Sequence, residues 1–132
     1  MDKNYIEQEL TNSIINLFYK VHHKLGFGFL EKIYKNALFI ELTDAGFNCE
    51  TEKAIDVFYR GKIVGQYYAD IIVNNKIILE LKASENLCVE HEYQLINYLK
   101  ATNIEIGLLL NFGKKPIVKR KIYTNDRKEI IY

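Results

Sequence analysis

The sequence predicts a mixed α/β fold in which helices cover both faces of one sheet. Two segments with helical spacing come first, three strand-like segments follow them, and a third helix then leads into a nearly unbroken apolar run. This order, α, α, βββ, α, β, is typical of a mixed sheet rather than of a helical bundle or a β-sandwich. The apolar run is expected where a strand is covered on both faces.

The composition fits a single domain over residues 1–132. Of the 132 residues, 48% are hydrophobic and 27% are charged, and the chain has one proline and no Gly/Ser-rich stretch that could act as a linker. This is enough apolar material for one core. The two cysteines, Cys49 and Cys88, lie too far apart for a Cys-x-x-Cys zinc site, so we expect free thiols.

Hydropathy and charge argue against two classes of protein. No apolar stretch approaches the roughly 20 residues of a membrane span, and the N-terminal segment lacks a secretion signal. We therefore expect a cytoplasmic protein with no membrane partner. The formal net charge of +1 argues against a protein that coats nucleic acid, but it is compatible with an enzyme that carries basic patches around an acidic site.

The helices and strands are predicted from spacing and turn residues. Apolar residues at steps of three or four predict helices over residues 3–25, ending at Gly26, from Leu30 to a stop at Gly46, and over residues 89–102. Strands are predicted at 55–59 and 63–67 around an Arg60-Gly61 hairpin, at 76–82 after a turn at Asn74-Asn75, at 106–112 and at 117–123. Alternation before that second turn places Tyr68, Asp70 and Ile72 on one face and Tyr67, Ala69, Ile71 and Val73 on the other.

The candidate site depends on the length of the Asn74-Asn75 turn. In the strand after it, Glu80 and Lys82 share one face, and Asp70 lies on the strand before it. A two-residue turn would place Glu80 and Asp70 on opposite faces. A three-residue turn that includes Lys76, with a bulge, sets Asp70 directly opposite Glu80. We predict the three-residue turn.

Two carboxylates that meet on a buried face point to a metal site, because a divalent cation removes the repulsion that would otherwise protonate one of them. Mg²⁺ takes hard oxygen ligands, and Mn²⁺ can substitute for it. A lysine beside such a site can orient water or stabilise charge during phosphodiester hydrolysis. Asp70, Glu80 and Lys82 suit this chemistry, although Glu-x-Lys is common by chance and solvated charges on an exposed sheet are the competing interpretation.

The segment from Gly28 to Tyr34 has the pattern Gly-x-x-Glu-x-x-Tyr, and further landmarks follow it: Tyr59 to Lys62, Tyr68 to Asp70, Leu79 to Ala83, His91 to Leu99 and Gly107 to Gly113. Over roughly residues 20–123 the chain thus resembles the GxxExxY proteins, a branch of the PD-(D/E)XK nuclease superfamily. The resemblance implies a restriction-endonuclease-like αβββαβ core, here with an extra N-terminal helix and a C-terminal strand.

The same resemblance implies roles for individual residues. Asp70 and Glu80 are implied as catalytic metal ligands, the Leu81 carbonyl as a further ligand, and Lys82 as the catalytic lysine. Glu31, from the helix before the sheet, is implied as an additional acidic residue that is catalytic and binds the metal. One helical turn separates Glu31 from Tyr34, which becomes a candidate for substrate binding.

The third helix supplies more candidates for substrate binding. Gln94 and Tyr98 match a Gln-x-x-x-Tyr motif that follows the catalytic lysine in exonuclease-like and helicase-associated members of the superfamily. A spacing of four places both side chains on one helical face, where an amide and a phenol can hydrogen-bond a phosphate or a base. His91 shares this face. Helix packing is the alternative for Gln94 and Tyr98, and a solvent-exposed position is the alternative for His91.

The sequence therefore favours a Mg²⁺-dependent nuclease whose partner is nucleic acid, with DNA favoured over RNA. The alternative is a catalytically silent nuclease-fold module that binds nucleic acid or a partner protein, because a fold does not entail an activity. An interaction protein with an accidental motif is a third interpretation. A homodimer that spans a duplex stays open, since nothing in the sequence decides the oligomeric state.

Overall fold

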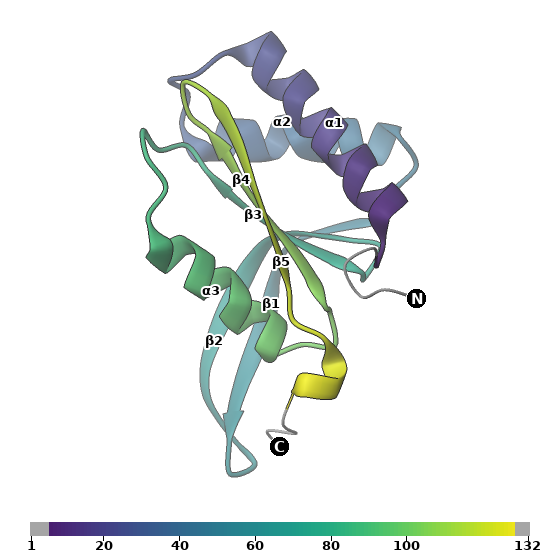
Figure 1. The fold of residues 1–132 in the computed structure, drawn as a ribbon, viewed down its shortest axis with the longest axis vertical. Helices are drawn as coiled ribbons and strands as arrows, with labels where there is room; N and C mark the ends of the chain where they lie inside the picture. Colours follow the sequence, from purple (N-terminus) through teal and green to yellow (C-terminus); the bar gives the residue numbers. More distant parts are fainter. Residues whose placement is uncertain (1–5, 129–132) are drawn as a thin grey trace.

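The computed structural model describes residues 6–128. The order of elements is α1 (Gln8–Leu25), α2 (Glu31–Asp44), β1 (Cys49–Tyr59), β2 (Lys62–Val73), β3 (Ile77–Lys82), α3 (Val89–Lys100), β4 (Ile106–Phe112), β5 (Pro116–Ile122) and a short 3₁₀ helix (Asn125–Arg127). The strands form one five-stranded sheet in the order β1-β2-β3-β4-β5, as Figure 1 shows, and within it the β3–β4 pair is parallel while the other pairs are antiparallel. The predicted mixed α/β class is confirmed.

The predicted helices differ from the structure only at their ends. α1 begins at Gln8 and ends before Gly26, whose φ of 69° breaks the helix; residues 3–5 of the predicted helix lie outside the described residues. α2 begins one residue after Leu30, and Gly46 follows its end with a φ of 91°. α3 ends at Lys100, two residues before the predicted end. No helix within residues 6–128 has the length and apolar character needed to cross a membrane.

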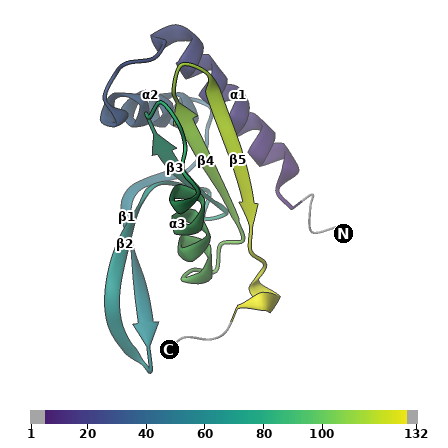
Figure 2. The ribbon, with the colours of Figure 1, turned by 60° about the vertical axis from the view of Figure 1, so that its left-hand side comes forward.

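Both faces of the sheet are covered (Figures 1 and 2). α1 and α2 pack on one face in the larger core, to which the sheet contributes Ile71, Leu79 and Leu108 among others. α3 packs on the other face in a smaller core, through Leu95 and Leu99. Every residue of β4 is buried, as the unbroken apolar run predicts.

The β1–β2 hairpin extends beyond the rest of the sheet. A two-residue turn at Arg60 (φ 52°) and Gly61 (φ 78°) closes it, as predicted. β2 pairs with β3 only from Ile71 to Val73, so the part of β2 nearer the turn pairs with β1 alone. In Figures 1 and 2 this part projects away from α1 and α2 as a curved two-stranded arm.

The second turn has three residues, as predicted. Asn74 and Asn75 both have left-handed φ values, 53° and 54°, and the Lys76 amide donates to the Val73 carbonyl over 2.9 Å. Val73 pairs with Ile77, and the pairs from there to Ile71–Leu79 run without a register shift. The same register sets Asp70 opposite Glu80. The length of the turn therefore fixes the parity of the two strands, without the bulge that we had expected.

One face assignment on β2 is wrong. Ile71 and Val73 share a face as predicted and lie in the larger core, but Ala69 packs in the smaller core with residues of α3. The ring centroids of Tyr67 and Tyr98 are 5.0 Å apart. The cause lies on β1, where Glu52 stands opposite Asp70 and has a φ of 53°. A left-handed residue inside a strand changes the direction of the backbone. The side chains of the arm therefore point to faces other than those that strict alternation along the strand predicts.

Candidate active site

Asp70 and Glu80 face each other where the hydrogen-bond ladder between β2 and β3 stops. The Asp70 amide donates to Glu80 Oε1 over 3.1 Å, and the Leu81 amide donates to Asp70 Oδ2 over 2.8 Å. Side-chain oxygens thus take the place of main-chain acceptors at the point where β2 leaves β3. Glu80 is only 5% exposed and Asp70 is half-buried. The two carboxylates converge as the three-residue turn predicts.

This pair carries an electrostatic conflict. Burial, and then the neighbouring Asp70 carboxylate, raise the pKa of Glu80 to about 8. Burial also raises the pKa of Asp70, although the hydrogen bond from Leu81 and the charges of Lys35 and Lys82 act in the opposite direction. Two buried carboxylates so close together do not both ionise readily near neutral pH, and a bound cation would resolve the conflict.

Lys82 and Glu31 share the electrostatic environment of this pair. Partial burial raises the pKa of Glu31, the charge of Lys82 lowers it, and the charge of Asp70 raises it again. Lys82 ends β3 on the same face as Glu80, and it forms no ion pair with the residues that the structure describes. Its ammonium group is therefore available to a bound anion beside the carboxylates.

The donor set at Asp70 and Glu80 fits a hard divalent cation. Among residues 6–128 no three Asp, Glu, His or Cys side chains lie close enough together to hold a metal ion. Glu31 as an additional ligand stays a prediction from the sequence. Each of the two carboxylates keeps one oxygen outside the hydrogen bonds described above. Two carboxylates with a neighbouring main-chain carbonyl are a donor set that Mg²⁺ accepts, since it keeps several of its waters.

α3 brings Tyr98 to the carboxylates. Tyr98 is 3% exposed, and burial together with the charges of Glu80 and Asp70 raises the pKa of its hydroxyl well above the ordinary value. Gln94 lies one turn earlier on the helix and is half-buried. His91 is half-buried as well, and its Nδ1 is enclosed without a hydrogen-bond partner among the described residues. Tyr98, the most deeply buried of the three α3 candidates, thus lies within reach of the charges of Glu80 and Asp70.

Tyr34 occupies a position that does not agree with substrate binding. Its side chain is fully buried and stacks on Phe112, with ring centroids 4.4 Å apart. Its hydroxyl donates to the Gly26 carbonyl over 2.7 Å and accepts from the Phe29 amide over 3.2 Å. Tyr34 therefore fixes the loop before α2, and through this loop it positions Glu31, the first residue of that helix.

Two charged residues near Asp70 were not predicted from the sequence as part of the site. Lys35 Nζ forms an ion pair with the Glu52 carboxylate, and the two charges shift the pKa of Asp70 in opposite directions. Lys35 lies four residues after Glu31 on α2, so its presence on the same helical face could have been noticed. The contribution of Glu52 depends on its left-handed backbone, for which the sequence carries no signal.

Comparisons with known proteins bear on the fold and the family of the chain. A family model described as the PD-(D/E)XK nuclease superfamily matches residues 8–122. Among solved structures, the one titled "Crystal structure of SSO0001" superposes with a TM-score of 0.57 at 25% sequence identity, covering 95% of this chain and 63% of that protein. No curated protein matches the chain. By the extent of the family match, the chain belongs to the PD-(D/E)XK nuclease superfamily.

Proposed function

We propose that the protein is a Mg²⁺-dependent nuclease of the GxxExxY branch that hydrolyses phosphodiester bonds in nucleic acid, in DNA rather than RNA. The observation that supports this most is the buried Asp70–Glu80 pair beside Lys82, in which the pKa of Glu80 is raised to about 8. Without a cation, such a pair lowers the stability of the folded protein, and with a cation it would form a catalytic metal site. Membership of the superfamily supports the same class of reaction.

Each residue of the site has a distinct role in this proposal. Asp70 and Glu80 would hold the cation through carboxylate oxygens, with the Leu81 carbonyl as a further oxygen ligand and Glu31, from α2, as an additional acidic ligand. The bound cation supplies Lewis-acid stabilisation and a water of lowered pKa. Lys82 donates hydrogen bonds to the attacking water or to a non-bridging phosphate oxygen as negative charge develops there.

α3 binds the substrate strand in this proposal. The Tyr98 hydroxyl is protonated at neutral pH, as an ordinary tyrosine is, and burial shifts its pKa further upward, so it can donate to a phosphate oxygen. Gln94 can donate from its amide to the next acceptor along the strand, and His91 can add a further hydrogen bond. These contacts position the phosphodiester, while Asp70, Glu80 and Lys82 carry the chemistry.

A cleavage assay tests the proposal. The purified protein is incubated with labelled single- and double-stranded DNA and RNA in Mg²⁺, Mn²⁺ or EDTA. We expect cleavage only with a divalent cation and a loss of several powers of ten in Asp70→Asn and Glu80→Gln. Asp56→Asn is the matched control, because the Asp56 carboxylate accepts a hydrogen bond from Gln66 Nε2 on the arm, away from the site.

Two results would contradict the proposal. Cleavage in EDTA, or full activity in Glu80→Gln, would exclude a metal-dependent reaction at this pair. Binding of nucleic acid without cleavage under every metal condition would instead favour the silent nuclease-fold module.

A further inference from the structure

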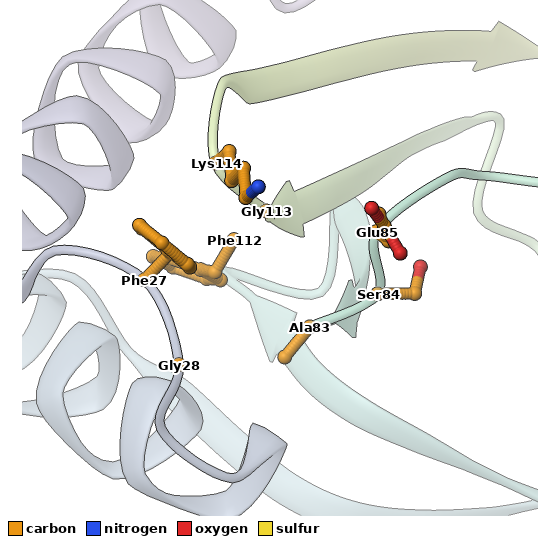
Figure 3. A pocket seen from close by; sticks show the side chains of 8 residues that line it. All are labelled: Phe27, Gly28, Ala83, Ser84, Glu85, Phe112, Gly113 and Lys114. Atoms are coloured by element: carbon orange, nitrogen blue, oxygen red, sulfur yellow. The ribbon is translucent and has the colours of Figure 1, made fainter.

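A cavity of about 360 Å³ lies next to the candidate active site, at the edge where the parallel strands β3 and β4 end (Figure 3). Its size falls within the roughly 300–1,000 Å³ of typical ligand sites. Three segments line it: Phe27-Gly28 before α2, Ala83-Ser84-Glu85 after β3, and Phe112-Gly113-Lys114 at the end of β4. Because Ala83 directly follows Lys82, the cavity continues the site along the sheet edge.

The cavity walls are held by buried hydrogen bonds. Asn111 is fully buried, and its side chain accepts from the Ser84 amide and donates to the Ser84 carbonyl, each over 3.0 Å. His22 Nε2 donates to the Gly113 carbonyl over 2.7 Å. A Cβ on Gly113 would lie 2.8 Å from the Ser84 carbonyl oxygen, so only glycine allows the two segments to approach this closely. The cavity is therefore formed before any ligand binds.

Phe27 presents an aromatic ring to this cavity from a fixed loop. Its side chain is 58% exposed, while the hydroxyl of Tyr34 holds the loop on both sides of it, at Gly26 and Phe29. Lys114 Nζ lies 5.8 Å from the centre of the Phe27 ring. An exposed ring on a rigid loop, with a cation over one face, offers a stacking surface for a base and a positive charge for the adjoining phosphate.

The rest of the lining suits the edge of a base. Figure 3 shows Glu85 and Ser84 across the cavity from Phe27 and Lys114. The Glu85 carboxylate is an acceptor for the exocyclic amine of a base, and the buried Phe112 ring supplies an apolar floor. Gly28 adds backbone without a side chain to the lining, and a Cβ at this position would meet no atom within 4 Å.

We propose that this cavity holds one unpaired nucleobase of the strand being cut, stacked on Phe27, with Lys114 at the adjoining phosphate. The inference rests on the proposed function and adds a substrate class to it. Ser84 lies two residues beyond Lys82, at most roughly 7 Å along the chain, so the base belongs to a nucleotide next to the scissile phosphate.

A base that is still paired cannot enter, because its partner covers the edge that the cavity reads. The preferred substrate is thus a single strand or an unpaired end.

Binding of labelled oligonucleotides tests this inference. Affinities are measured by fluorescence anisotropy in Ca²⁺, which takes oxygen ligands like those of Mg²⁺, for single strands that carry one abasic nucleotide at each position in turn. We expect Phe27→Ala to weaken binding of the intact single strand about tenfold and Phe27→Trp to preserve it. Tyr19→Ala is the matched control, since Tyr19 is 45% exposed on α1 and does not line the cavity.

The abasic series separates stacking from a general loss of structure. At one position, removal of the base should weaken the wild type about tenfold and leave Phe27→Ala unchanged. An effect of Phe27→Ala no larger than that of Tyr19→Ala, or an equal loss with and without the base at every position, would overturn the inference while the cleavage assay still supports the proposed function. A wild-type protein that neither binds nor cuts nucleic acid would overturn both.

Discussion

The main-chain amide of Asp70 donates a hydrogen bond to Glu80 over 3.1 Å, and the Asp70 carboxylate accepts one from the residue after Glu80 over 2.8 Å. This reciprocal arrangement holds two carboxylates side by side, with Glu80 almost fully buried and Asp70 half-buried. Their mutual repulsion and desolvation oppose folding, and the attraction of a bound divalent cation would offset both effects. Stability, pH and metal binding should therefore be linked through this pair.

Metal-free protein should lose stability as the pH rises between the pKa of Glu80 in the unfolded chain and its raised pKa in the folded protein. The pKa of Glu80 is raised from 4.5 to about 8 in the folded protein. Its protonated form therefore favours folding below pH 4.5, and this contribution is lost as the pH rises through about 8. Urea unfolding in EDTA at pH 5 and pH 8.5 measures the effect, which Glu80→Gln should greatly reduce.

Addition of Mg²⁺ at pH 8.5 should reverse this loss. A cation that binds the folded protein alone raises the unfolding free energy in proportion to the logarithm of its concentration. The rise should occur in the wild type and in Asp56→Asn but not in Glu80→Gln. A wild-type protein whose stability in EDTA is the same at both pH values, and which Mg²⁺ does not stabilise, would show that the two carboxylates are not coupled as described.

Substitution of Lys82 should separate catalysis from metal binding. Lys82→Met keeps the length of the side chain and removes its charge, so we expect kcat to fall about a hundredfold to a thousandfold, by the size of effect seen for charge-stabilising donors. Affinity for Mn²⁺ should be unchanged or tighter, because the ammonium repels the cation. Lys76→Met is the control, since Lys76 is a partly exposed lysine that pairs with Glu7. An unchanged kcat in Lys82→Met would remove the lysine from the mechanism.

Tyr34→Phe should destabilise the protein although it removes a single oxygen atom. The hydroxyl accepts from the Phe29 amide and donates to the Gly26 carbonyl, so its loss leaves two main-chain groups without this partner. We expect the unfolding free energy to fall by about 1–2 kcal/mol. Tyr19→Phe, at an exposed ring, should change it by less than about 0.5 kcal/mol. Equal stability of the two variants would show that the loop is held by other contacts.

Because Glu52 has a left-handed backbone, glycine at this position should be more stable than a residue that favours strands. With a φ of 53°, Glu52 carries a steric cost of about 1–2 kcal/mol that glycine does not have. Glu52→Gly should therefore be more stable than Glu52→Val by about 1–2 kcal/mol, although both lose the ion pair with Lys35. Strand propensity alone predicts the reverse order. Thermal unfolding of the two variants decides between them.

The parts of the fold that local chemistry dictates were predictable. Residues 106–112 form β4 with the predicted bounds, since a run in which Asn111 is the one polar side chain is accommodated best between two covered faces. The three-residue turn was predictable as well, because only that length places Asp70 and Glu80 on one face. The need to bring the two carboxylates together thus predicted the length of this turn.

The remaining features depend on packing between distant segments. The signature that contains Tyr34 identified an important residue but not its role, because its burial arises from contact with Phe112 on a strand far along the chain. The turned arm, which carries Ala69 to the smaller core, follows from one left-handed residue on the neighbouring strand. No spacing rule reports such a residue, since glutamate rarely adopts this conformation.

A crystal structure of the protein soaked in Mn²⁺ tests the central claim most directly, because anomalous scattering locates the ion without reference to activity. The claim predicts one ion in contact with oxygens of both Asp70 and Glu80 and with the Leu81 carbonyl, and no ion at this position in Glu80→Gln. Saturating Mn²⁺ that leaves the two carboxylates without an ion, in a protein that still cleaves nucleic acid, would contradict it.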